Sequence, residues 1–198
     1  MSSVPRFTRF SLVVSACIAW LVLGSGLASA QTRHHITIGL GYSKLTSNDI
    51  KDDAFGIDFS NAGNGVFAYR YTLNPTIDLT VDTRGTASTD SQQGVDLWLL
   101  NSFFGPGVRW NPAVGGARLY LQGNFFFSNE EVEIQQGGAT LSASEGGTGF
   151  GLFGGVDIPL SNLLSMPLEV NYIYAKPADD VSGVGVTIGL TFNFGQMQ

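Results

Sequence analysis

The final strand-length segment of the chain, residues 184–194, alternates strictly between two kinds of side chain. Its even positions, from Val184 to Phe194, are all apolar, and its odd positions are glycine, threonine or asparagine. Successive side chains on a strand point to opposite faces, so this segment has one apolar face and one small, polar face. Its length suits a tilted strand that crosses a bilayer in roughly 9–11 residues. A strand of a soluble sheet also fits the pattern, so the rest of the chain has to decide.

The same alternation recurs in seven earlier segments. We expect these strands at about residues 36–42, 67–73, 77–84, 95–110, 118–127, 149–158 and 168–174. Short links rich in proline and asparagine follow the second, fourth and sixth strands, whereas longer polar links, residues 44–64, 85–94 and 129–147, follow the first, third and fifth. Short turns at one end and longer loops at the other are typical of a transmembrane barrel. The sequence therefore predicts an all-β fold, an eight-stranded antiparallel transmembrane β-barrel.

Two places depart from the alternation. Gly105-Pro106-Gly107 interrupts the fourth expected strand, and proline within a strand predicts a bulge or a bend. After the first thirty residues, only residues 160–164 have a sequence that suits a turn of helix.

Charged side chains of the expected strands fall on the face opposite the apolar rows. They are Arg70, Asp78, Asp82, Arg84, Arg118, Asp157 and Glu169. A lysine or arginine at mid-depth on the lipid side costs about 2–4 kcal/mol. Inside a narrow barrel these side chains can pair, and because unpaired buried ions are costly we expect a hydrogen-bonded charge network in a packed, polar lumen. A soluble lipocalin-like barrel would turn the apolar rows inward, but most rows carry Phe or Tyr and would overfill the interior of eight strands.

The composition also favours an outer surface that faces lipid. Charged residues make up only 13% of the chain, against about 25% in typical domains. Aromatic residues lie at the ends of several expected strands, where a membrane-interface girdle would place them: Tyr42, Trp110, Phe127, Tyr174 and Phe194. Aromatic residues favour strands in any sheet, so ordinary sheet packing is the alternative reading of this set.

The N-terminus has the pattern of a secretory signal. Arg6 and Arg9 precede an apolar run over residues 12–23, and the small residues 28–30 follow. We therefore expect residues 1–30 to be a cleaved signal peptide and residues 31–198 to form the barrel domain. The run is shorter than the roughly 20 apolar residues of a spanning helix. A lipoprotein box ending at Cys17 is a further alternative, but the apolar run continues past it.

Removal of the signal leaves a strongly acidic chain. Ten Lys and Arg minus Arg6 and Arg9 leaves eight, against sixteen Asp and Glu, a net charge of −8. An acidic chain without basic clusters is a poor nucleic-acid binder. The single cysteine, Cys17, lies in the expected signal, so no disulfide framework is expected.

The chain resembles the small eight-stranded outer-membrane β-barrel proteins of Gram-negative bacteria, the porin-family or outer-membrane β-barrel domain proteins that include the OmpA and OmpX groups. Residues 28–30, 104–110 and 190–194 carry the resemblance. It implies a location in the cell outer membrane, contact with outer-membrane lipids and lipopolysaccharide, and a monomer. It also implies that the barrel-assembly machinery reads the last strand through Leu190, Phe192 and Phe194. The family usually ends on the aromatic residue, whereas four residues follow Phe194 here.

Motifs for catalysis or cofactors are weak. The glycines of residues 39–41 and 147–151 are not followed by the helix that a dinucleotide fingerprint needs, so we expect them to make room in the lumen. His34 and His35 are neighbours that point to opposite faces, and we expect them to be mobile. Ser43 and Asp49 lie beyond the far end of that strand, too distant for a catalytic triad. We expect no catalytic, cofactor or metal site, and no enzyme.

Acidic residues gather in the links at the loop side of the expected barrel. They are Asp49, Asp52, Asp53, Asp58, Glu130, Glu131, Glu133, Glu145, Asp179 and Asp180. Their spacing does not match the ligand pattern of a calcium loop. We expect these acidic side chains to be solvated by water. The alternative is that they bind divalent cations that bridge the protein to lipopolysaccharide.

These features predict an integral outer-membrane barrel that contributes to envelope integrity or surface interaction. A narrow channel for ions or small solutes is the alternative, because lumen glycines could leave a gap. A lipid-modifying enzyme and a soluble ligand-binding barrel are less favoured.

Overall fold

Eight long antiparallel strands dominate the computed structural model, which describes residues 34–46, 51–52, 57–92, 95–114, 117–136, 139–176 and 181–195. They are β1 (His34–Thr46), β4 (Asn61–Asn74), β5 (Ile77–Gln92), β6 (Val95–Trp110), β8 (Ala117–Gln136), β9 (Ala139–Pro159), β10 (Leu164–Lys176) and β11 (Val181–Phe194). Three two-residue strands lie in the links: β2 (Lys51–Asp52), β3 (Ile57–Asp58) and β7 (Ala113–Val114). The predicted signal peptide lies outside the described residues.

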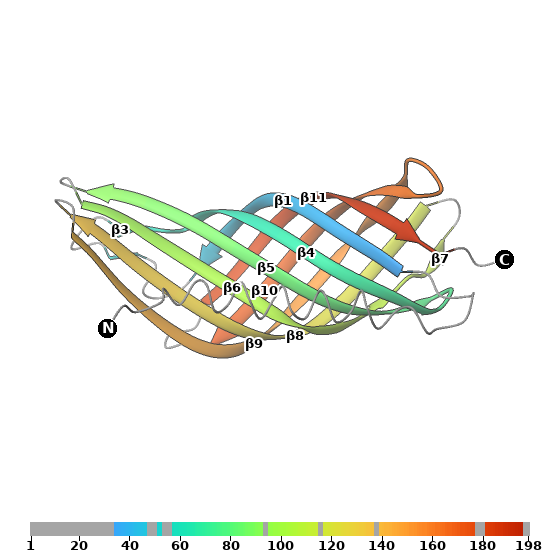
Figure 1. The fold of residues 1–198 in the computed structure, drawn as a ribbon, viewed down its shortest axis with the longest axis horizontal. Coiled ribbons are helices and arrows are strands. Elements are labelled where there is room, and N and C mark those ends of the chain that lie inside the picture. The colour runs from blue at the N-terminus through green and yellow to red at the C-terminus, as the bar shows by residue number, and fades with distance from the viewer. Residues whose placement is uncertain are drawn as a thin grey trace, which may run out of the picture.

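The long strands close into a barrel (Figure 1). Each pairs with its neighbours in chain order, β6 pairs with β8, and β11 returns to pair with β1 from Phe194 opposite His34 to Ser182 opposite Thr46. Closure leaves no unpaired edge along the shared length of the strands, which is the condition for crossing lipid with strands. The predicted eight-stranded antiparallel barrel is confirmed. No helix in the described part of the chain is long and apolar enough to span a membrane.

We call the end of the barrel that carries the links β4–β5, β6–β8 and β9–β10 the turn end. At the first link, the side-chain oxygen of Asn74 accepts hydrogen bonds from the Thr76 backbone nitrogen at 2.9 Å and its hydroxyl at 2.8 Å. This local bond stabilises the Asn-Pro turn. At the third link, residues 160–163 form bends, so the predicted helical turn there is wrong.

The opposite end, which we call the loop end, contains more strand than the sequence predicted. Residues 85–92 belong to β5, and residues 129–136 and 139–147 pair with each other in β8 and β9. The prediction of long loops over these ranges is wrong. Above the apolar band neither face needs to be apolar, so the alternation fades while the backbone ladder continues.

Of the bulge or bend predicted at Gly105-Pro106-Gly107, the bulge is wrong. The β6–β8 register is the same on both sides of it, with Phe104 opposite Phe127 and Gly107 opposite Asn124. A Cβ on Gly105 would collide with the backbone of β8 at Phe125. Glycine here permits close approach of β8 and keeps the strands in register. The register shift lies instead in β4, between Thr72 and Asn74.

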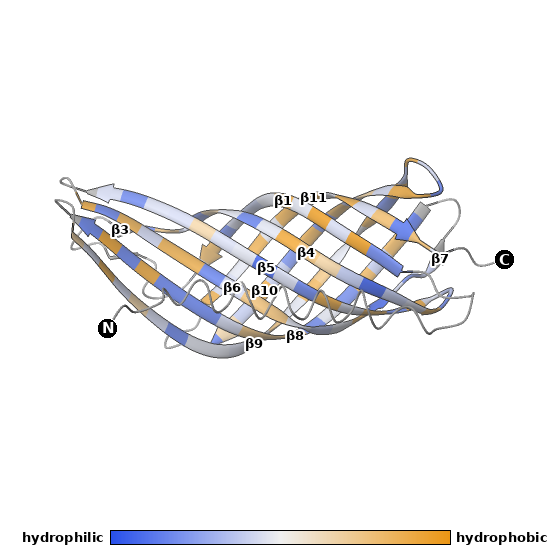
Figure 2. Cartoon of the chain, in the orientation of Figure 1, coloured by the Kyte–Doolittle hydropathy of each residue, from blue (hydrophilic) through white to orange (hydrophobic). Residues whose placement is uncertain are grey.

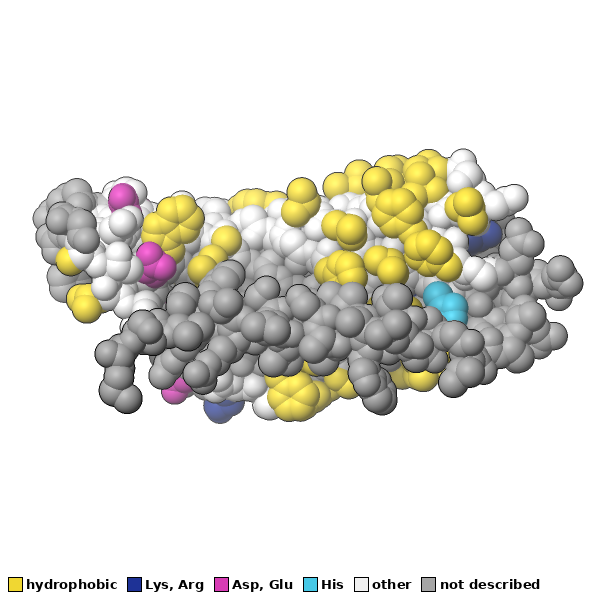
Figure 3. Space-filling view, in the orientation of Figure 1, with side chains coloured by type: hydrophobic (Ala, Val, Ile, Leu, Met, Phe, Trp, Pro, Cys, Tyr) yellow, Lys and Arg dark blue, Asp and Glu magenta, His cyan; other side chains and the backbone are white. Residues whose placement is uncertain are grey.

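The outer wall is apolar along all eight long strands. Apolar segments recur along the strands in Figure 2, and apolar side chains cover the visible middle and turn-end part of the surface in Figure 3. Among the most exposed are Leu40, Leu121, Leu152 and Val170, each more than half exposed. A surface of this kind suits lipid as its solvent.

Candidate functional site

The interior of the turn-end half holds ion pairs, and Arg84 on β5 lies at their centre. Its guanidinium donates to Glu169 Oε1 at 2.6 Å and to Asp82 Oδ2 at 3.0 Å. It also lies over the ring of Phe153, 3.8 Å from the ring centroid. Arg84 and Asp82 are almost wholly buried. Two carboxylates and one aromatic face therefore hold this cation inside the barrel.

A second group of ions surrounds Asp157 on β9. Arg70 donates to Asp157 Oδ2 at 3.4 Å, and Arg109 donates to the same oxygen. Arg109 also lies over the ring of Tyr120, 3.4 Å from its centroid. Asp78 lies 3.9 Å from Arg70 and accepts hydrogen bonds from Thr72 and Asn111. Every ion of this group is thus linked to the next.

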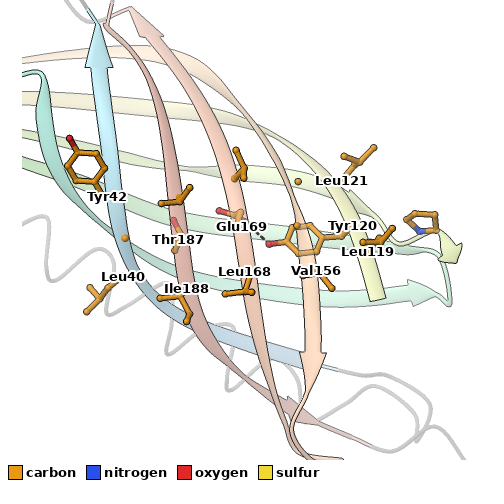
Figure 4. Close-up of a pocket in the computed structure, with 16 residues that line it drawn as sticks. Leu40, Tyr42, Leu119, Tyr120, Leu121, Val156, Leu168, Glu169, Thr187 and Ile188 are labelled. Atoms are coloured by element: carbon orange, nitrogen blue, oxygen red, sulfur yellow. Dashed lines mark hydrogen bonds between the residues drawn. The ribbon is translucent and has the colours of Figure 1, made fainter. Parts of the chain in front are cut away.

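Neutral side chains complete the network. The Tyr120 hydroxyl donates to Glu169 Oε2 at 3.0 Å, and Gln122 donates to Asp82 Oδ2 at 2.9 Å. In Figure 4, Tyr120 reaches toward Glu169, while Leu40, Leu168 and Ile188 point away from the barrel axis. The outward residues line an apolar groove on the wall. The neighbours Glu169 and Leu168 on β10 show the pattern: Glu169 faces the network and Leu168 faces lipid.

Most of the predicted lumen residues lie in this network, but two details differ from the sequence prediction. Arg118 is exposed at the start of β8, outside the ion pairs found among the described residues. It stands where the barrel opens at the turn end, so water can solvate its charge. Arg109 is buried but was not predicted. Arg109 follows Gly105-Pro106-Gly107. The two-residue alternation places it inside only if it continues unbroken from Phe103 through the glycines and proline, where a bulge or a bend was predicted.

The loop-end half of the interior combines a buried apolar cluster with small polar side chains, among them Ser43, Ser88 and Asn101. Along β6 the inward side chains run from Arg109 at the turn end through Phe103 to Leu99 and Leu97 at the loop end. Phe103 and Phe153 lie on either side of Phe126, with ring centroids 6.0 and 6.1 Å from its own. Above this aromatic layer is a buried cluster, which we call the apolar plug: Leu45, Phe59, Ala62, Leu97, Leu99 and Val181. The prediction of a polar lumen therefore describes only part of this half, because the apolar plug was not predicted.

Little free space remains around the ion pairs. A cavity of about 20 Å³ lies between Arg70, Asp82, Tyr120 and Gln122, enough for about one water molecule. Within the described residues, Asp82 Oδ1 and Arg70 Nε have no protein partner. A water in the cavity would satisfy such atoms.

The two histidines lie at the start of β1 and are held in place. His34 Nδ1 lies 2.5 Å from the Tyr69 hydroxyl, whereas His35 contacts Asn193 Oδ1 at 2.6 Å and Thr72 Oγ1 at 3.0 Å. The predicted opposite orientation is confirmed, and the prediction of a mobile pair is wrong. Ser43 is buried near the other end of β1, and Asp49 lies outside the described residues.

The loop end carries the acidic side chains. Those on the long strands are Asp90, Asp96, Glu130, Glu131, Glu133 and Glu145, and acidic side chains are visible at this end in Figure 3. Asp58 precedes β4 and donates its backbone N–H to Asp90 Oδ2 at 2.9 Å. Asp49, Asp53, Asp179 and Asp180 lie outside the described residues, as does the side chain of Asp52. Across the described ranges, no group of three or more His, Cys, Asp or Glu is placed to hold a metal.

The last strand places its apolar row on the outer wall. Leu190, Phe192 and Phe194 are each about two-fifths to one-half exposed and lie opposite Ile38, Ile36 and His34 of β1. Their role as an assembly signal stays a prediction. Of the predicted girdle residues, Tyr42, Trp110, Phe127 and Phe194 are exposed, and Tyr174 packs against Phe150 at 5.4 Å between ring centroids.

Solved structures of three bacterial proteins are similar to this barrel. Ail, the attachment invasion locus protein of Yersinia pestis, is 17% identical, with 83% of this chain and 99% of Ail covered and a TM-score of 0.59. Neisserial surface protein A is 13% identical over 81% of this chain and 97% of its own, with a TM-score of 0.60. A major outer membrane protein from Thermus thermophilus is 13% identical over 82% and 99%, with a TM-score of 0.56.

No curated protein matches the sequence. The family model for the outer membrane protein beta-barrel domain matches residues 15–194, which is most of the chain and the whole barrel. The chain therefore belongs to the outer membrane protein beta-barrel domain family, and its place is the cell outer membrane.

Proposed function

We propose that this outer-membrane protein is a non-enzymatic surface-contact protein that binds cationic partners at its loop end. The observation that carries the proposal is the contrast between a filled lumen and an acidic end that extends beyond the apolar band. The barrel serves as the anchor, and the extended strands β5, β6, β8 and β9 carry the contact surface.

The filled lumen argues against transport through the barrel. Ion pairs, three phenylalanine rings and the apolar plug follow one another along the interior, and the cavity among the ion pairs holds about one water. In the part of the chain that the structure describes, the side-chain partners of His34 and His35 are Tyr69, Asn193 and Thr72, and no carboxylate hydrogen-bonds to either ring directly. The Thr72 hydroxyl, which contacts His35, donates a hydrogen bond to Asp78. His35, Thr72 and Asp78 face the crowded interior, where a substrate has no room. These features favour an anchor over a channel or an enzyme.

The charge of the loop end defines the kind of partner. Among the described side chains there, six acidic residues of the long strands stand against Lys44 and Lys176. Such a surface attracts cations and repels polyanions over about 8–10 Å at physiological salt. The similar protein Ail has been solved in complex with the heparin analogue sucrose octasulfate. We expect this chain to show the opposite preference.

The names of two similar proteins, attachment invasion locus protein and Neisserial surface protein, lend support by analogy. Fold alone does not transfer function, so the support comes from the loop-end charge. A contribution to envelope integrity is the second part of the proposal. The experiment below separates it from surface contact.

The test compares bacteria that carry the protein, a charge-neutralised variant or no protein. In the variant, the outward carboxylates Asp96, Glu131 and Glu133 become Asn, Gln and Gln, which keeps side-chain size. Cells with the wild-type protein should adhere to polylysine-coated surfaces more than cells without it, and the variant should lose that gain. Adhesion to heparin-coated surfaces should not rise.

Gel migration with and without boiling checks that the variant barrel is folded. Equal adhesion of wild-type, variant and empty cells to polylysine would contradict surface contact. Higher detergent sensitivity of empty cells, restored by both proteins, would then favour envelope integrity as the function.

A further inference from the structure

The link between β9 and β10 carries two exposed leucines at the turn end of the barrel. Leu160 is 52% exposed and Leu163 is 65% exposed, and both belong to the bends at residues 160–163, which we call the leucine turn. In Figure 1 this link is the orange loop that stands out from the barrel at the turn end. A single exposed leucine is ordinary on a protein surface, whereas two on one short turn need a physical reason.

The first link of the turn end shows how such a turn is built for water. It contains Asn74, Pro75 and Thr76, and the Asn74 side chain accepts hydrogen bonds from the backbone nitrogen and the hydroxyl of Thr76. Asparagine and proline form turns through their own hydrogen bonds and restricted backbone. The leucine turn differs from this neighbour in carrying large apolar side chains that a bend does not require.

The leucine turn also lies in a stretch without charge. Residues 158–168 contain no Asp, Glu, Lys or Arg, and the charges on either side, Asp157 and Glu169, belong to the ion pairs of the lumen. Charged side chains resist transfer into lipid. No ion of this stretch therefore holds the leucine turn in water.

Much of the backbone of the leucine turn finds partners within the protein. The N–H groups of Leu160 and Ser161 both donate to the Leu164 carbonyl oxygen at 2.9 Å, and the Leu163 N–H donates to Ser161 Oγ at 3.3 Å. Asn193 on β11 donates its N–H to the Leu163 carbonyl oxygen at 2.8 Å. Backbone groups without partners are costly in a region poor in water, so these bonds suit the turn to such a region.

The Asn193 bond also joins the leucine turn to the lipid-facing wall. Leu164, the next residue along the chain, lies opposite Phe192 in the β10–β11 register. Phe192 and Phe194 are exposed on the outer wall. The leucine turn therefore extends the apolar surface of the wall at the turn end, where the lipid band gives way to headgroups.

The size of this surface indicates what covers it. A stable contact between proteins buries about 800 Å² on each partner, and the side chains of one short turn are too small to supply that area. Lipid needs no minimum area, because it solvates every apolar side chain at its depth. Outer-membrane barrels keep their short turns on the periplasmic side, so the leaflet beside the leucine turn is the periplasmic one.

From these observations we propose that the leucine turn inserts into the headgroup region of the phospholipid leaflet at the turn end, with Leu160 and Leu163 as its apolar anchors. Interfacial segments bury their apolar side chains about 5–10 Å into the boundary between headgroups and acyl chains. Ser161 and Asn162, between the leucines, supply hydrogen-bonding groups that suit headgroups. The proposal concerns the end of the barrel opposite the proposed contact surface and is independent of that function.

Fluorescent labels test the position of the turn. The only cysteine of the chain, Cys17, lies in the predicted signal peptide, so the mature protein accepts one label at a time at Leu163→Cys, Leu168→Cys or Pro75→Cys. Each variant is placed in nanodiscs of phosphatidylethanolamine and phosphatidylglycerol, and gel migration with and without boiling checks its fold. The quenchers are iodide in the water and lipids that carry a spin label near the headgroup.

Leu168 faces lipid and is the positive control, whereas Pro75 lies in the polar turn and is the control for water. Quenching by iodide should be at least about threefold weaker at Leu163 than at Pro75, because the label lies below the headgroup surface. Quenching by the spin-labelled lipid at Leu163 should approach that at Leu168.

A second set of variants tests the leucines themselves. A label at Asn162→Cys is read with both leucines present and with Leu160→Ser and Leu163→Ser together. Loss of the two apolar side chains should raise iodide quenching at least about twofold, because their burial in lipid holds the turn in place. Leu168→Ser, on the wall, is the matched control and should leave quenching of the Asn162 label unchanged.

Three results would overturn the proposal. Equal iodide quenching at Leu163 and Pro75 would place the leucine turn in water. A Leu163 label shielded from both quenchers would mean that protein, such as a second copy of the chain, covers the turn. Unchanged quenching of the Asn162 label after loss of both leucines would show that they do not hold the turn in the leaflet. None of these results depends on the adhesion experiment.

Discussion

The two halves of the lumen solve the same packing problem with different chemistry. At the turn end, Arg70, Arg84 and Arg109 are buried among carboxylates, Tyr120 and Gln122. At the loop end, the phenylalanine layer and the apolar plug fill much of the interior, together with small polar side chains such as Ser88 and Asn101. The comparison teaches that the ion pairs lie beneath an apolar cover. This cover limits the access of water to them from the loop end.

The largest effect should follow from breaking the ionic half. Arg84→Met leaves Asp82 and Glu169 buried without their shared cation, and loss of one partner of a buried pair costs about 3–5 kcal/mol. The free energy of unfolding, measured by denaturant titration in detergent micelles, should fall by that amount. Arg118→Met, at the exposed turn-end mouth, is the control and should change it by about 0.5 kcal/mol or less. Equal effects of the two substitutions would contradict the network.

A smaller effect should follow from breaking the apolar half. Leu99 is 4% exposed within the apolar plug, and Leu99→Ala should cost about 2–3 kcal/mol through lost burial and a cavity. The same denaturant titration measures it, with outward Leu100→Ala on the neighbouring position as the comparison. If Leu99→Ala costs no more than about 0.5 kcal/mol, the plug is not a packed core.

The smallest effect tests the link between the two groups of ion pairs in the turn-end half. Tyr120→Phe keeps the ring beneath Arg109 but removes the hydroxyl that donates to Glu169. Loss of a hydrogen bond to a charged group should cost about 1.5 kcal/mol. Tyr172→Phe, whose ring faces outward, is the matched control in the unfolding measurement. A cost for Tyr120→Phe no larger than for Tyr172→Phe would mean that Glu169 relies on Arg84 alone.

Much of the barrel could be predicted from sequence because lipid imposes a strict two-residue period. Leu40, Leu121 and Ile188 show that period, and the charges of the ionic half had to lie on the opposite face. The same reasoning missed Arg109, because Pro106 before it predicts a bulge or a bend that would break the alternation. Gly105 and Gly107 instead let β8 approach closely and preserve the register.

The loop end could not be predicted in the same way. Above the membrane, water satisfies either face of a strand, so Glu131 and Ser144 pair across β8 and β9 without any alternation to reveal it. β9 also pairs with β8 beyond its pairing with β10, a difference in strand length that appears only once the register is known. The apolar plug combines residues of several strands with Phe59 of the first link, which no local pattern brings together.

The central claim is that this barrel is a sealed anchor whose activity lies at its acidic loop end. Planar-bilayer recording of the purified wild-type protein tests it most directly, with a conducting porin as positive control for insertion. The account predicts no reproducible single-channel steps, because ion pairs, phenylalanines and apolar plug fill the lumen in series. Reproducible steps of uniform conductance would contradict it and would favour a narrow channel.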